Sequence, residues 1–178
     1  LVIDEQGEFV IPLLCGHEGG ANQWGKVLAN VISAQLVLTT AKAYTSPVYS
    51  VGMGCEKNCN VDHLRGLLDD ALSRIGLKLS DIDGLSSIDI KAQEKGLLML
   101  SEQTELKFLT YDKNALSTVE HLLASKSEYV YQTVGVYGVA ESAALLSAQS
   151  ITGNTSELIL KKIKTPKATC AIARSYYD

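Results

Sequence analysis

The stretch Val48-Tyr49-Ser50-Val51-Gly52-Met53-Gly54-Cys55 opens the larger part of the chain as an apolar strand that runs into a glycine-containing loop. Asn60 then precedes a segment, 61–75, whose apolar residues recur on one helical face, and Gly76 follows it. Asn is a favoured residue before a helix and Gly a favoured residue after one. The stretch therefore predicts a strand, a loop and a long helix, which is the repeating unit of an α/β fold.

Strands and helices keep alternating toward the C-terminus, which favours a layered fold with a mainly parallel sheet. A Pro-containing turn near the end joins two further strands, and these are expected to form an antiparallel hairpin at the sheet edge. We therefore predict two three-layer α/β/α domains with mainly parallel sheets and a C-terminal edge hairpin. The segments after Gly76 are strands at 85–88, 108–109, 158–160 and 169–173, and helices at 97–104, 115–123 and 141–148.

Toward the N-terminus the same pattern recurs on a smaller scale. Strands are predicted at 1–3, 9–11 and 36–40, with a glycine-rich loop at 15–20. Trp24, Val27, Leu28, Val31 and Ile32 then share one face of a helix that Asn22 is placed to start. Because the segment 41–47 is short, mixed in composition and ends at a proline, we expect the domain boundary there, giving domains 1–46 and 47–178.

Composition excludes several classes of protein. The chain has 178 residues, 46% of them hydrophobic, so it has enough apolar side chains for a core and is not expected to be disordered. A net charge of -4 makes nucleic acid a poor candidate partner, because phosphate binding needs clustered Lys and Arg. The sequence has no apolar run long enough to span a bilayer, and its four cysteines are too few for a disulfide scaffold. A reducing cytoplasm is the expected compartment.

The segment 11–22, Ile-Pro-Leu-Leu-Cys-Gly-His-Glu-Gly-Gly-Ala-Asn, resembles the N-terminal signature of the CbiG proteins, the cobalt-precorrin-5A hydrolases of cobalamin biosynthesis. Ala140-Glu141-Ser142 departs from this family, because Cys-Glu-Pro is expected there. The other matching blocks follow in the family's order at 51–55, 87–91, 94–97, 134–136, 141–145 and 171–174.

The resemblance implies a defined reaction. The substrate is a cobalt-bound, partly contracted tetrapyrrole that carries a δ-lactone, and water opens this lactone. The extruded carbon and its methyl group then leave as acetaldehyde, giving cobalt-precorrin-5B. Such chemistry needs a group that activates water, donors for the oxyanion, and an acid–base group for carbon–carbon cleavage. The reaction needs no cofactor of the protein, because the cobalt arrives with the substrate. The resemblance does not decide between a monomer and a homodimer.

His17 is the preferred general base, since it lies in a glycine loop beside a helix start and imidazole titrates near neutral pH. Glu94 and Glu141 are the other catalytic candidates. For each of the three a structural role is the alternative: a loop hydrogen bond for His17, and a favourable position at a helix N-terminus for the two glutamates. The expected substrate-binding residues are Gly16, Gly19, Gly20, Asn22, Gly52, Gly54 and Lys91.

Two of these candidates and two other patterns have ordinary explanations. Asn22 has an N-cap role as its alternative, and Lys91 has an ion pair with Asp89. Cys55, Cys59 and His63 recur every four residues, but Asn60 is expected to start a helix between them, so we predict no metal site. Flat aromatic surfaces for a macrocycle are offered by Tyr129, Tyr131 and Tyr137, although the first two alternate at strand spacing.

A second function competes with hydrolysis. Proteins that resemble only the C-terminal part of the CbiG family occur in the aerobic branch of the pathway, where no such hydrolysis is assigned to them. A non-catalytic corrinoid-binding or chaperone module is therefore the alternative. The loop from Gly16 to Asn22 favours the hydrolase, because the stand-alone domain lacks it.

Overall fold

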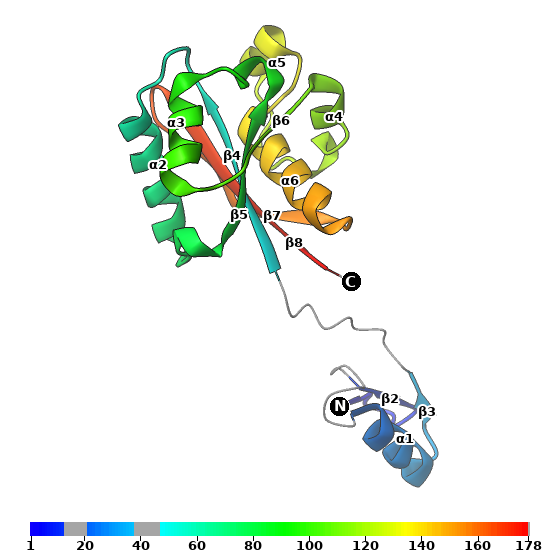
Figure 1. The fold of residues 1–178 in the computed structure, drawn as a ribbon. Helices are drawn as coiled ribbons and strands as arrows, with labels where there is room; N and C mark the ends of the chain where they lie inside the picture. The colour runs from blue at the N-terminus through cyan, green and yellow to red at the C-terminus, as the bar shows by residue number, and fades with distance from the viewer. Residues whose placement is uncertain (13–20, 38–46, 178) are drawn as a thin grey trace. The chain divides into compact units, whose positions relative to one another are not determined.

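A computed structural model describes residues 1–12, 21–37 and 47–177 of the chain (Figure 1). The chain divides into two compact units, Leu1–Thr45 and Ser46–Asp178. Each unit has its own sheet. No helix in the described ranges has the length and apolar character that crossing a membrane would require.

The larger unit is built on a five-stranded sheet in the order β6-β5-β4-β8-β7. β4, β5 and β6 are parallel neighbours, and β8 and β7 form an antiparallel hairpin that joins the sheet through β4. The α/β class and the antiparallel C-terminal hairpin are therefore confirmed. The strands are β4 (Pro47–Cys55), β5 (Ile82–Ile88), β6 (Phe108–Tyr111), β7 (Ser156–Lys164) and β8 (Ala168–Tyr176).

Helices cover both faces of this sheet, so the larger unit has three layers (Figure 1). α2 (Val61–Ile75) and α3 (Lys95–Thr104) lie on one face, and α4 (Lys113–Ser117) and α6 (Val139–Thr152) lie on the other. α5 (Glu128–Val134) precedes α6. Three short 3-10 helices connect these elements: Leu79–Asp81, Asp89–Lys91 and Glu120–Leu122.

The ends of α2 follow the predicted capping pattern. The Asn60 side chain accepts a hydrogen bond from the Asp62 backbone N–H at 2.7 Å, which satisfies one of the free donors at the helix start. Gly76 ends the helix with φ at 69°, a left-handed conformation that glycine adopts without steric cost. Both predicted boundaries of this helix are confirmed.

The two faces of the sheet are packed in different ways. On the side of α2 and α3, β4 contributes Val51 and Met53 to a core of large aliphatic side chains such as Leu64 and Leu68. On the other side, the sheet and α6 meet largely through small residues, with larger side chains such as Ile88 and Leu145 beside them, and the helix backbone lies directly against β4 at Gly52. The small buried residues of this contact are Ser50, Gly52, Ser86, Ala171 and Ala173 from the strands, and Ala140, Ala143, Ala144, Ser147 and Ala148 from α6.

The smaller unit consists, in its described part, of three strands and α1 (Ala21–Ile32). β1 (Val2–Ile3) pairs antiparallel with β2 (Phe9–Ile11), and β2 pairs parallel with β3 (Gln35–Leu36). The Gly25 side of the helix faces the sheet, because a Cβ there would lie 2.7 Å from Pro12 Cγ.

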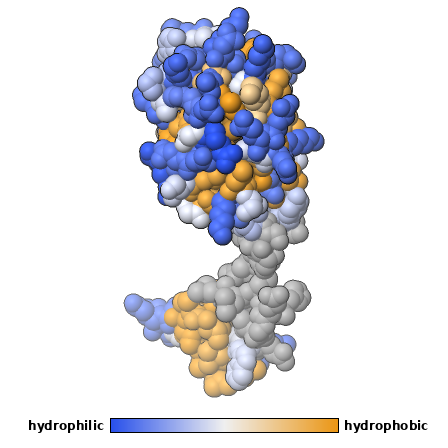
Figure 2. Space-filling model, turned by 60° about the vertical axis from the view of Figure 1, so that its left-hand side comes forward, coloured by the Kyte–Doolittle hydropathy of each residue, from blue (hydrophilic) through white to orange (hydrophobic). Residues whose placement is uncertain are grey.

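The predicted apolar face of α1 is largely exposed. Trp24 is 67% exposed, Val27 51% and Val31 74%. Figure 2 shows the hydrophobic surface that the smaller unit presents as a result. Helical periodicity therefore located the helix correctly but did not identify the side that packs on the sheet, which carries small residues.

Three local predictions were wrong. Gly52 and Gly54 lie inside β4 and not in a loop, because β4 continues to Cys55. The predicted helix 115–123 is broken into α4 and the 3-10 turn Glu120–Leu122. Tyr129 and Tyr131, whose alternation indicated a strand, lie on α5, which Ser127 caps by accepting from the Val130 N–H.

We predict that Gly52→Ala destabilises the larger unit. An added Cβ would lie 2.0 Å from the Ala140 carbonyl oxygen and 2.5 Å from the Ala144 nitrogen, so helix backbone must move. The expected loss in the free energy of unfolding is about 3 kcal/mol, measured by chemical denaturation. Gly66→Ala is the control. Nothing lies within 4 Å of its Cβ position in α2, so it should raise stability by about 0.5–1 kcal/mol. Equal effects of the two substitutions would contradict the packing argument.

We also predict an alkaline loss of stability through Cys170 in β8. Burial raises the pKa of this thiol from 9.0 to about 12, and the charge of Asp70 adds to the rise. The neutral thiol therefore stabilises the fold fully below about pH 9, and this contribution is lost as the pH rises toward about 12. In denaturation at a series of pH values, the stability difference between wild type and Cys170→Ala should shrink above pH 9. A difference that stays constant would rule the effect out.

Candidate functional site

The carboxyl ends of β4, β5 and β6 meet at one edge of the sheet, since the three strands are parallel neighbours. Ligands of open α/β sheets usually bind at this edge. Cys55 ends β4, and the 3-10 turn Asp89–Lys91 follows β5 directly. Glu94 comes next, as the residue before α3. Of the residues predicted for the site, Lys91 and Glu94 therefore lie where a ligand is expected.

Lys91 and Glu94 form a largely buried pair. The Lys91 ammonium lies 3.5 Å from Glu94 Oε2, and the two side chains are 16% and 6% exposed. The ion pair predicted between Lys91 and Asp89 is wrong, since Lys91 pairs with Glu94 instead. Asp89 Oδ1 accepts from the Ile90 N–H at 2.7 Å. Glu94 Oε1 is buried and has no hydrogen-bond partner among the described residues. A buried carboxylate normally has its oxygens hydrogen-bonded, so this atom requires an explanation.

The Cys55 thiol belongs to the same cluster. Burial raises its pKa to about 12, the positive charge of Lys91 opposes this rise, and the charge of Glu94 adds to it. The thiol is thus protonated at neutral pH and is no nucleophile. Cys55 is half-buried, packs against the core and lies beside the pair. The sequence signal that could have placed Cys55 in this cluster was its position at the end of a strand, directly after Gly54.

The first turn of α3 is held tightly against the loop between β4 and α2. A Cβ at Gly96 would lie 2.1 Å from the Cys59 carbonyl oxygen, so a side chain at this position would displace the helix from the loop. This contact fixes the start of α3, and with it Glu94, close to the end of β4.

Glu141 has a different environment, although it too is buried, at 1% exposure. Its Oε2 accepts hydrogen bonds from the backbone N–H groups of Ala124 at 3.0 Å and Ser125 at 3.2 Å. Its Oε1 accepts from the Lys162 N–H at 2.9 Å. Both oxygens are thus used to tie the segment before α5 and the edge strand β7 to the start of α6. The geometry gives Glu141 a structural role.

The glycines of β4 also have structural explanations. Gly52 is covered by Ala140 and Ala144 of α6. A Cβ at Gly54 would lie 2.8 Å from Thr169 Oγ1 of the neighbouring strand β8. Packing thus explains why both positions are glycine, and their contact with substrate remains a prediction.

The predicted N-terminal site falls largely outside the described residues. Gly16, His17, Gly19 and Gly20 all lie there, so their roles remain predictions. The helix α1 begins at Ala21, which puts Asn22 in its first turn and not before it. The side chain of Asn22 is not among those that the structure describes, so its N-cap and substrate-binding roles both remain predictions.

Cys59 and His63, which were weighed as metal ligands with Cys55, are positioned by other contacts. Cys59 is buried in the core beside α2, and His63 Nε2 lies 2.7 Å from Thr165 Oγ1 in the β7–β8 turn. Over ranges 1–12, 21–37 and 47–177, no group of three His, Cys, Asp or Glu side chains is arranged to hold a metal ion.

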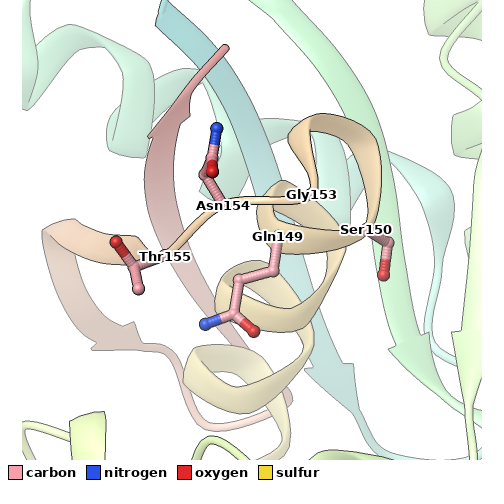
Figure 3. Close-up of a pocket in the computed structure, with 5 residues that line it drawn as sticks. All are labelled: Gln149, Ser150, Gly153, Asn154 and Thr155. Carbon is pink, nitrogen blue, oxygen red and sulfur yellow. The ribbon is translucent and has the colours of Figure 1, made fainter. Parts of the chain in front are cut away.

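Two further surface features involve other residues. Tyr131 stacks on Tyr137 with ring centroids 4.5 Å apart, and Lys126 lies 5.2 Å from the Tyr137 ring centre. At the other end of the sheet, a depression follows α6 (Figure 3). Its neutral lining offers no acid or base, so it does not compete with the Lys91–Glu94 pair. The residues that line it are Gln149, Ser150, Gly153, Asn154 and Thr155.

Two family models match the chain in sequence order. Residues 1–43 match the model described as "Cobalamin synthesis G N-terminal", and residues 49–173 match "Cobalamin synthesis G C-terminus". The chain belongs to the cobalamin synthesis G (CbiG) family. The process in which it takes part is therefore cobalamin biosynthesis, as the resemblance implied.

The CbiG chain is similar to proteins with two different names. It is 33% identical over 141 residues to "Protein CobE" of Sinorhizobium sp, covering 79% of this chain and 88% of that protein. It is 26% identical over 144 residues to the "Cobalt-precorrin-5A hydrolase" of Priestia megaterium, covering 81% of this chain but only 37% of that protein. The crystal structure of a CobE from the cobalamin (vitamin B12) biosynthetic pathway superposes with a TM-score of 0.72 at 31% identity. The superposition covers 78% of this chain and 98% of the CobE chain.

We predict losses of stability of different size for the two buried glutamates. Glu141→Gln puts an amide N–H group against backbone N–H donors and should lower the free energy of unfolding by about 3 kcal/mol. Glu94→Gln loses only one long contact of 3.5 Å, and its amide oxygen can still accept from the partly exposed Lys91, so the expected loss is smaller, about 1 kcal/mol. Thermal and chemical denaturation of both variants measures the contrast. A fully stable Glu141→Gln variant would show that the three backbone contacts do not support the fold.

Proposed function

We propose that this CbiG chain hydrolyses the δ-lactone of cobalt-precorrin-5A and releases acetaldehyde to give cobalt-precorrin-5B. The observation that supports the proposal is the match to both family regions in one chain, 1–43 and 49–173. A relative that matches 81% of the chain is named for this hydrolysis. The substrate brings the cobalt, so the chain needs no cofactor of its own for either bond that is broken.

In this proposal the N-terminal loop opens the lactone. His17 takes a proton from the attacking water, and backbone N–H groups at Gly16, Gly19 and Gly20 stabilise the oxyanion. Asn22, in the first turn of α1, contributes a further polar contact to the substrate. In the larger unit, Lys91 and Glu94 act on the substrate. Glu141 is left out, because its oxygens are used by backbone N–H groups.

A non-catalytic corrinoid-binding or chaperone role is the alternative. The similarity to a protein named only CobE, at 33% identity, favours it, since that name states no reaction. The two functions differ in what the purified full-length chain does with the cobalt-bound lactone. A hydrolase releases acetaldehyde with turnover, whereas a binding module retains the tetrapyrrole and releases none.

We predict that His17→Ala abolishes lactone opening without unfolding the protein. General acid–base catalysis contributes about 100- to 10,000-fold, so opening should slow by at least about 100-fold. Mass spectrometry of the tetrapyrrole follows opening, an acetaldehyde assay follows the product, and thermal unfolding checks the fold. His121→Ala is the matched control, because this imidazole is exposed on the 3-10 turn Glu120–Leu122.

The outcomes separate the proposals. Wild-type activity in His121→Ala with none in His17→Ala supports His17 as the base. A His17→Ala variant that turns over like wild type removes His17 from the mechanism. Wild-type protein that binds the lactone substrate but never opens it refutes the hydrolase and leaves the binding module.

A further inference from the structure

The larger unit contains two buried glutamates at helix starts, and only one of them is satisfied by the fold. Glu141 uses both oxygens on three backbone N–H groups. Glu94 has one 3.5 Å contact with Lys91, and its Oε1 has no partner in the described part of the chain. A structural ion pair must be well hydrogen-bonded to offset the cost of desolvating both charges. Stability therefore explains Glu141 but not the Lys91–Glu94 pair.

The surroundings of the pair favour proton transfer over simple anion binding. Lys91 is mostly buried at 16% exposure, and Glu94 nearly completely at 6%. The other titratable groups that act on this cluster are Cys55 and Cys59 as neutral thiols, with Glu56 and Lys167 farther out. A free anion would be repelled by Glu94. A ligand that offers both a donor and an acceptor would instead satisfy Glu94 Oε1 and the Lys91 ammonium together.

The geometry points to Lys91 and Glu94 as the acid–base pair for the carbon–carbon cleavage that follows lactone opening, an inference that rests on the proposed function. The opened lactone leaves a hydroxyl group on the extruded carbon, which also carries the methyl group. This hydroxyl group is a donor for Glu94 Oε1. The ring carbon to which the extruded carbon is bonded is where a proton must arrive.

The step balances without any external reactant. Glu94 takes the hydroxyl proton, and the O–H electron pair forms the carbonyl bond of acetaldehyde. The bond between the extruded carbon and the macrocycle breaks, its electron pair passes to the ring carbon, and Lys91 supplies the proton there. The pair is then a carboxylic acid beside a neutral amine. Proton transfer across the 3.5 Å contact restores the carboxylate and the ammonium.

Lactone opening and carbon–carbon cleavage require different arrangements of acid and base, so different residues carry out the two steps. In ester hydrolysis one base takes a proton from water and returns the same proton to the leaving oxygen. Carbon–carbon cleavage needs a base at oxygen and an acid at carbon at the same time, which a contacting Lys and Glu provide. A site with little solvent also protects the carbanion-like ring from unwanted protonation elsewhere.

The test separates the two steps in the full-length chain. Glu94→Gln and Lys91→Met are incubated with the cobalt-bound lactone, and the tetrapyrrole is analysed by mass spectrometry alongside the acetaldehyde assay. Both variants should still open the lactone and accumulate a species heavier than the substrate by one water. Acetaldehyde release should fall by at least about 100-fold. Glu102→Gln is the matched control, because this exposed glutamate lies on α3 as well.

Each outcome decides the inference. Accumulation of the opened alcohol in both variants, with normal turnover in Glu102→Gln, supports the pair. Normal acetaldehyde release by Glu94→Gln overturns it, and so does a variant that folds but cannot open the lactone. A wild-type chain that leaves the lactone intact refutes the proposed function, which is a separate result because it is seen before any substitution is made. Retained lactone opening also serves as the internal check that each variant is folded.

Discussion

The direct contact between the backbone of α6 and strand β4 is the constraint on which the larger unit depends. Gly52 and the alanines of α6 bring helix and strand so close that a Cβ at Gly52 would lie 2.0 Å from a helix carbonyl oxygen. This contact sets the height of α6 above the sheet. It also places Glu141, in the first turn of α6, where it can accept from Ala124, Ser125 and Lys162. One close approach thus organises a helix, a loop and the edge strand.

The opposite face of the sheet is packed with larger side chains. There the core between the sheet and helices α2 and α3 contains long aliphatic side chains. The connections from β4 to α2 and from β5 to α3 carry Cys55, Lys91 and Glu94 at the carboxyl edge. The rigid face thus holds the sheet in place, and the reactive groups gather where the strands end. This division is usual in α/β proteins, where loops on a rigid scaffold carry function.

Much of this fold could be predicted from sequence, because its signals are local. The helix 61–75 was predicted from its apolar periodicity and from its capping residues Asn60 and Gly76. The C-terminal hairpin was predicted from two apolar runs on either side of a proline-containing turn. The prediction that Gly52 lies in a loop was wrong, because a glycine is required there by a helix nearly 90 residues later in the chain. No local sequence pattern shows such a contact. Tyr129 and Tyr131 were misassigned because two aromatic residues at alternate positions fit a strand as well as a short helix. Glu94 and Glu141 were indistinguishable in sequence, because only their hydrogen-bond partners separate them.

The exposed face of α1 gives the smaller unit a spectroscopic signature of its own. Trp24 is the single tryptophan of the chain and is 67% exposed, whereas the larger unit contains tyrosines but no tryptophan. Selectively excited tryptophan emission therefore reports on the smaller unit alone. Far-ultraviolet circular dichroism, by contrast, is dominated by the helices of the larger unit. The same unfolding experiment can thus follow the two units through separate optical channels, without labels or truncation.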